Sequence, residues 1–349
     1  MIDPMRRKRH IMRVAVTIAA LGFSIVALSG VHEALQARQG APAAGATTSA
    51  PVQGGGSVTT GIATNRRPVA GVPSTCPQPV NVQPGVFPAT VATIASSDGR
   101  QWTVPAPVNE GPVAVDVYNN CTGTGDIPDY ASQLKTVVID EDGVEITGFV
   151  HADNYFELYV NGRFVARDSL PMTPFNTSVV RFKAKYPMTY AIMGVDWETH
   201  LGVGLEYGAF NVGDAGLKAY FSDGNGTHPD WRAETFYIAP LDDPSCVRVT
   251  ATGRDSTFCL QGVRATCAEK EPNACLAIHY PIPPDWTAPR FNDAVWPAAI
   301  VWPASAVTNQ RAYTDYTKLF GDADFIWTRN LRLDNLMLAR YTARGPRRR

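Results

Sequence analysis

The dipeptide Asn161-Gly162 constrains the fold of this chain more than any other local feature. It lies between two β-type runs, Tyr155–Val160 (YFELYV) and Arg163–Ala166. Two-residue hairpin turns of type I′ need positive φ at both central residues, and Asn-Gly meets that need best. The segment is therefore predicted to be a β-hairpin.

Further short β-type runs follow the same pattern, each bounded by Gly, Asn or Asp. They are Lys135–Ile139, Val144–His151, Ser178–Ala184, Met188–Val195, Gly216–Ser222, Glu234–Ala239, Phe325–Leu331 and Asn335–Tyr341. The chain has 29 Gly and 27 Pro and no convincing amphipathic helix. Many short strands with regular turns predict an all-β fold, an antiparallel sandwich or jelly roll, over residues 89–341.

The N-terminus is typical of an export signal. Five basic residues, Arg6 to Arg13, precede the run Val14–Val31, which contains no charge. This layout fits a cleaved signal peptide, and the run is also just long enough to anchor the chain in a membrane. Under either alternative, residues 1–35 deliver the rest of the chain outside the cytoplasm, as a secreted or membrane-anchored protein of the cell envelope.

Residues 36–88 are rich in Ala, Gly, Pro, Ser and Thr and are predicted to be a flexible linker. Residues 342–349 form a basic tail, interpreted as solvated, with phosphate or anionic lipid as the alternative contact. Between residues 36 and 339 acidic side chains outnumber basic ones. This balance argues against nucleic acid as a partner.

Six cysteines follow the apolar segment, and in an exported chain an even number predicts disulfides. The last four fall within a Cys-rich insertion, residues 244–280, and are expected to pair locally, whereas Cys76 and Cys121 can then pair with each other. The spacing does not settle the connectivity. The candidates are Cys76, Cys121, Cys246, Cys259, Cys267 and Cys275.

Three segments carry a resemblance to a known family. Ala152–Val165 (ADNYFELYVNGRFV) resembles the strand–turn–strand signature of galactose-binding-like β-sandwich domains, which accompany many glycosidases and lectins. Trp286–Ala298 (WTAPRFNDAVWPA) is similar to their Trp-rich surface loop, and Phe325-Ile326-Trp327 with the last strand to a third element. The loop follows the hairpin here, whereas in the family it precedes it, which implies a circular permutation.

A second resemblance concerns the segment Asp196–Glu206 (DWETHLGVGLE) and the following GDAGLKAYFSDG. Both are similar to segments of exported bacterial proteins of unassigned function. This likeness supports one continuous domain and implies no activity.

Two groups are candidate carbohydrate contacts. Asp153, Asn154 and Tyr155 offer polar groups and a ring at the edge to which the family resemblance points, or they form an Asx turn that starts the hairpin. Trp286, Trp296 and Trp302 lie in a Pro-rich stretch, where their rings either stack on sugars at the surface or fill the core.

Asp196, Glu198 and His200 alternate, so in a strand they would share one face and could bind a metal or act as acid–base groups. A solvated strand face is the alternative. A calcium site is also compatible with such sandwiches, without assignable ligands. The sequence favours an exported, non-catalytic binding module with a carbohydrate or glycoconjugate as partner, and a metal-dependent enzyme that uses Asp196, Glu198 and His200 stays open as an alternative. A glycan hydrolase and a structural envelope protein are the other hypotheses.

Overall fold

The computed structural model describes residues 53–69, 90–117, 130–168, 177–198, 200–203, 213–259, 275–307 and 311–347. The predicted leader, the segments 36–52 and 70–88 of the predicted linker, and Cys76, Cys121 and Cys267 lie outside these residues. No helix among the described residues is long and apolar enough to cross a membrane.

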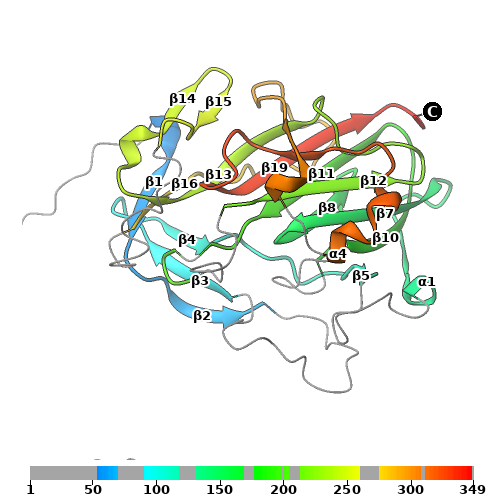
Figure 1. Cartoon of the computed structure of the whole chain (residues 1–349), viewed down its shortest axis with the longest axis horizontal. Helices are drawn as coiled ribbons and strands as arrows, with labels where there is room; N and C mark the ends of the chain where they lie inside the picture. Colours follow the sequence, from blue (N-terminus) through cyan, green and yellow to red (C-terminus); the bar gives the residue numbers. More distant parts are fainter. Residues whose placement is uncertain are drawn as a thin grey trace, which may run out of the picture. The chain divides into compact units, whose positions relative to one another are not determined.

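The described residues form two seven-stranded sheets and two small ones (Figure 1). The first large sheet has the order β1-β16-β13-β19-β11-β8-β9, and the second has β17-β18-β12-β7-β10-β5, with β6 parallel to β10. The small sheets are β2-β3-β4 and the hairpin β14-β15. The predicted all-β sandwich is confirmed.

The strands of the first sheet are β1 (Ser57–Thr60), β8 (Tyr155–Val160), β9 (Arg163–Arg167), β11 (Met188–Val195), β13 (Arg232–Leu241), β16 (Leu276–His279) and β19 (Asp334–Ala343). Those of the second are β5 (Val115–Asp116), β6 (Thr136–Val138), β7 (Val144–Asp153), β10 (Thr177–Ala184), β12 (Gly216–Phe221), β17 (Ile300–Trp302) and β18 (Phe325–Trp327).

The small sheets contain β2 (Thr64–Pro68), β3 (Thr90–Ala95), β4 (Gln101–Val104), β14 (Arg248–Thr250) and β15 (Gly253–Asp255). The described helical turns are η1 (Gln53–Gly55), α1 (Tyr130–Gln133), η2 (Pro244–Cys246), α3 (Ala304–Val307), α4 (Arg311–Thr314) and η4 (Thr317–Phe320).

The first sheet is buried on both faces. Along β19, Met337 and Ala339 join the core shared with the second sheet, whereas Leu336 and Leu338 join a separate core on the opposite face. That opposite core also contains residues of the β2-β3-β4 sheet. Every residue of β11 is therefore buried, since successive side chains of a strand point to opposite faces and both faces are covered.

The hairpin predicted at Asn161-Gly162 is confirmed. Both residues have positive φ, 50° and 78°, and they join β8 to β9 in antiparallel register. Asn161 also accepts a hydrogen bond from the backbone N–H of Thr189 at 2.8 Å. The turn is thus tied to the neighbouring strand β11 as well as to its own hairpin.

Arg340 of β19 holds the segment 286–293 onto the first sheet. Its buried guanidinium donates to the carbonyls of Trp286 and Ala288 and to the carboxylate of Asp293, the last at 2.9 Å. The ring of Phe291 lies 5.1 Å from it. One cation therefore fixes a loop that has little regular structure of its own.

Three predicted boundaries are wrong. Residues 57–60 and 64–68 are strands β1 and β2 rather than linker, and β1 pairs with β16 from Ser57 to Thr60. Residues 276–279, assigned to the Cys-rich insertion, are the sheet strand β16. The described part of the basic tail continues β19 to Ala343 and then hydrogen-bonds to the turn at Asp223. In all three, long-range strand pairing or backbone hydrogen bonding overrides local composition.

Candidate functional site

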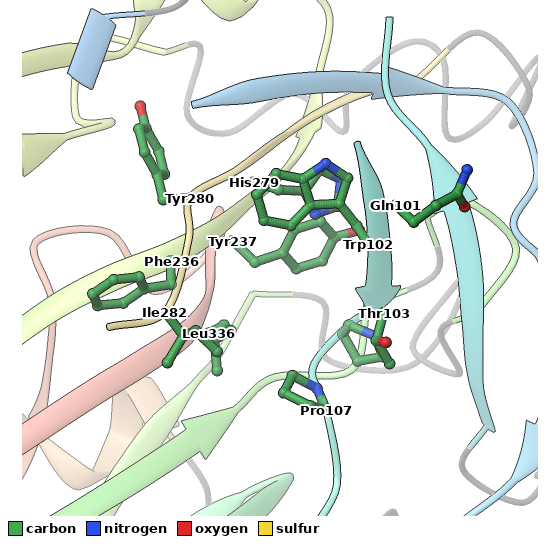
Figure 2. A pocket seen from close by; sticks show the side chains of 11 residues that line it. Gln101, Trp102, Thr103, Pro107, Phe236, Tyr237, His279, Tyr280, Ile282 and Leu336 are labelled. Atoms are coloured by element: carbon green, nitrogen blue, oxygen red, sulfur yellow. The ribbon is translucent and has the colours of Figure 1, made fainter. Parts of the chain in front are cut away.

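A pocket of about 190 Å³ lies between the β4 region and the first sheet (Figure 2). Strand β4 and the segment after it form one wall, and β13, β16, the segment after β16 and β19 form the other. The lining residues are Gln101, Trp102, Thr103, Pro105, Pro107, Phe236, Tyr237, His279, Tyr280, Ile282 and Leu336.

Three rings stack at the centre of the pocket. The ring of Trp102 lies 5.1 Å from that of His279 at an angle of 21°, and His279 lies 4.8 Å from Tyr237 at 26°. Figure 2 shows the three overlapping. Tyr237 and His279 are direct cross-strand partners on β13 and β16, so the sheet register itself sets their stacking. Trp102, half-buried, covers them from β4.

Hydrogen bonds fix two members of this stack. Nε2 of His279 lies 2.6 Å from the hydroxyl oxygen of Thr59 on β1. The indole N–H of Trp102 donates to the hydroxyl of Ser96 at 3.0 Å. The imidazole and indole rings are therefore held in position before any ligand binds.

The imidazoles at the site are neutral at physiological pH. Burial lowers the pKa of His279 to about 3. The same desolvation, with a smaller contribution from His279, lowers the pKa of His200 to about 3. Burial also raises the pKa of Tyr237 well above its usual value, so its hydroxyl keeps its proton.

Some buried polar atoms at the Tyr237 end of the stack lack hydrogen-bond partners among the described residues. They are the hydroxyl of Tyr237 and both ring nitrogens of His200, whose ring lies 5.0 Å from that of Tyr237. Both side chains are buried, at 1% and 0% exposure. Buried polar groups normally have a partner, so these atoms indicate a place where a ligand or water binds.

An arginine beside a buried carboxylate packs against one wall of the pocket. The guanidinium of Arg254 lies over the rings of Phe236 and Tyr280, at 4.5 Å and 3.9 Å. Both rings line the pocket. The carboxylate of Glu234 accepts the backbone N–H of Arg254 and interacts electrostatically with its guanidinium. The Arg254 guanidinium therefore packs on two rings that line the pocket, and the nearby Glu234 carboxylate balances its charge.

The predicted contacts Asp153, Asn154 and Tyr155 do not lie at this pocket. All three are buried, at 0%, 2% and 0% exposure. The amide oxygen of Asn154 accepts the backbone N–H of Trp197 at 2.5 Å, and the Tyr155 hydroxyl donates to Glu157 at 2.9 Å. These residues join β7 to β8 from inside the fold and do not line the pocket.

The predicted surface group of Trp residues is also placed inward. Trp286 and Trp296 are 7% and 6% exposed and belong to the core beneath the small sheet. Trp302 is partly buried and donates its indole N–H to the carbonyl of Thr328 at 3.1 Å. The alternative weighed for them, core packing, describes Trp286 and Trp296.

Asp196, Glu198 and His200 follow β11, which ends at Val195, and all three are buried. No group of three His, Cys, Asp or Glu within the described ranges is arranged to hold a metal ion. The alternation therefore does not produce the predicted metal cluster, and burial also excludes the solvated strand face. His200 alone approaches the pocket, through Tyr237.

Cys246 and Cys259 form a disulfide, as local pairing in the insertion predicts, and Cys275 is also disulfide-bonded. The disulfide closes the loop that carries the β14-β15 hairpin and Arg254. It thus lies within the element that supports the pocket wall.

No sequence motif marks the residues at the centre of the pocket. Tyr237 and His279 lie in strands, and only the register between β13 and β16 brings them together. The β-type run Glu234–Ala239 predicts a strand, but it does not reveal the partner strand.

Comparison of the chain with family models, curated proteins and solved structures finds no match. The structure shows the sandwich architecture, and no comparison supports the galactose-binding-like assignment.

Proposed function

We propose that this protein is an exported binding module whose pocket at Trp102 receives a carbohydrate. The observation that carries the proposal is the half-buried indole of Trp102 at a pocket that the amide residue Gln101 and the hydroxyl residue Thr103 also line. Sugar rings have an apolar face and a polar rim, so aromatic rings beside amide and hydroxyl groups suit them.

The dimensions of the pocket favour one sugar unit. Its volume, about 190 Å³, is below the roughly 300–1,000 Å³ of pockets that enclose drug-sized ligands. A single ring fits that space, and the remainder of a longer glycan would extend into solvent. We therefore expect terminal sugar units to bind in preference to internal ones.

The disulfides support export. Cys246, Cys259 and Cys275 are all bonded, and such bonds persist in oxidising compartments. The proposal places the chain in the cell envelope or outside the cell, delivered by residues 1–35. Fractionation of cells that express the full chain, or the chain lacking residues 6–31, tests this: only the full chain should leave the cytoplasm.

Two packing contacts support a distant, permuted relation to galactose-binding-like domains. The ring of Tyr159 in the β8-β9 hairpin lies 5.4 Å from that of Trp286. Arg340 in the last strand holds the segment that begins at Trp286. The three segments that carry the resemblance are thus assembled against one another although their order differs from that of the family.

A glycan array with the purified full chain tests the binding function, followed by titration of any glycan that binds. Trp102→Ala should weaken that binding about tenfold or more, because stacking and buried apolar area are both lost. Trp302→Ala is the control, since Trp302 is also partly buried but does not line the pocket. Thermal unfolding of both variants checks that they fold.

Two outcomes would overturn the proposal. One is an array without any bound glycan. The other is binding that Trp102→Ala leaves unchanged, which would place the glycan elsewhere on the surface.

A further inference from the structure

The pocket has an unusual lining for a site on a chain with 63 charged residues, 31 basic and 32 acidic. None of the described residues that line it is Asp, Glu, Lys or Arg. Its one titratable base is His279, which burial keeps neutral. Among the described lining residues, a ligand therefore meets aromatic, aliphatic, hydroxyl and amide groups and the neutral imidazole of His279.

Charged side chains near the pocket are already paired. Arg254, behind the rings of Phe236 and Tyr280, interacts with Glu234. Arg100, which precedes the lining residue Gln101, lies 3.5 Å from the carboxylate of Asp98. Each of these two cations thus already has a carboxylate of the chain nearby.

The inner end of the pocket offers hydrogen bonds. The Tyr237 hydroxyl has no partner among the described residues, and the ring nitrogens of His200 next to it have none either. A neutral imidazole supplies one donor and one acceptor, and a phenol supplies both functions. A ligand hydroxyl, which also donates and accepts, matches the phenol of Tyr237, which of these two residues is the one that lines the pocket.

We infer that the pocket selects an uncharged sugar, such as a neutral hexopyranose, and that the Tyr237 hydroxyl hydrogen-bonds to one of its hydroxyl groups. This rests on the proposed function and adds the class of sugar. An acidic sugar would lose hydration of its carboxylate without gaining a cation, which disfavours it. Selection here arises from the absence of charge in the lining rather than from a repelling residue.

Matched sugar pairs test the selection. The full chain is titrated by calorimetry with the methyl glycosides of glucose and galactose and with those of glucuronic and galacturonic acid. Each pair differs in a single carboxylate. The neutral member should bind at least about tenfold more tightly.

The outcomes separate the inference from the proposed function. Equal or tighter binding of the uronates, still lost in Trp102→Ala, would overturn neutral selection and leave the carbohydrate site in place. Failure of all four sugars, together with an empty glycan array, would remove the proposed function itself.

Two pairs of variants locate the selection in the named residues. Tyr237→Phe should weaken binding of the neutral sugar about two- to tenfold, as expected for one hydrogen bond between uncharged groups. Tyr280→Phe is the matched control: its hydroxyl is also buried and unpartnered, but in Figure 2 it points away from the ring stack. Equal affinities of the two variants would overturn the role of Tyr237.

Gln101→Lys adds a cation at an exposed lining position, where folding is unaffected. It should raise affinity for the uronates more than for the neutral sugars, and Gln133→Lys, exposed on α1 outside the pocket lining, should not. A uronate affinity that Gln101→Lys leaves unchanged would contradict the inference that missing charge sets the selection.

Discussion

Replacing Arg340 with Met should strongly destabilise the fold. The Arg340 side chain is 1% exposed and donates to two carbonyls and one carboxylate in the segment 286–293. Met keeps much of the side-chain volume but removes every donor. The carbonyl groups of Trp286 and Ala288 would then have no hydrogen-bond donor inside a closed interface.

The magnitude follows from these contacts. Breaking a buried ion pair by removing one partner costs about 3–5 kcal/mol, because the other groups stay buried without compensation. The Asp293 side chain is 29% exposed, so water can partly replace the guanidinium there. We therefore expect a loss near the lower end, about 3 kcal/mol.

Urea unfolding followed by tryptophan fluorescence measures this loss. Arg344→Met is the control, since Arg344 is exposed just beyond the end of β19, and it should change the unfolding free energy by less than about 0.5 kcal/mol. Asp293→Asn should cost less than Arg340→Met. A loss below about 1 kcal/mol for Arg340→Met would refute the reasoning that this cation holds the loop.

Three further predictions concern buried groups. Burial raises the pKa of Asp334 to about 7, so the wild-type unfolding free energy should fall by about 3 kcal/mol as pH rises from 4 to 7. Asp334→Asn should remove this fall, which urea unfolding across that pH range measures. The pKa values of His200 and His279 are lowered to about 3, so below about pH 6.5 the unfolded chain binds protons at these residues that the folded chain does not. The fold therefore loses stability as pH drops, and His200→Leu should move the acid-unfolding midpoint to lower pH. Replacing Cys246 and Cys259 by Ser together should cost about 3 kcal/mol, and an unchanged thermal midpoint would contradict this.

Local patterns predicted the framework well. The Asn161-Gly162 turn, the runs that became β7, β8, β10, β11, β12 and β13, and the sandwich architecture all depend on period-2 alternation and turn chemistry within a few residues. Such signals are present in the sequence itself, because each strand shows its preference before it finds a partner.

The pocket could not be predicted in the same way. Trp102, Tyr237 and His279 are widely separated in the chain, and they meet only through register and the packing of one sheet on another. Trp286 and Trp296 misled the prediction for a related reason. A Pro-rich loop has the composition of a surface segment, yet Arg340 draws this one against the sheet.

The pairing of β1 with β16 has a practical consequence for anyone who shortens this chain. A fragment that begins at residue 89, the predicted start of the domain, would lack Ser57–Thr60 and leave one side of β16 unpaired. Unpaired backbone donors and acceptors at a sheet edge recruit strands from other molecules. Such a fragment should self-associate or precipitate, and a soluble version should begin no later than Gln53, so that η1 and β1 are retained.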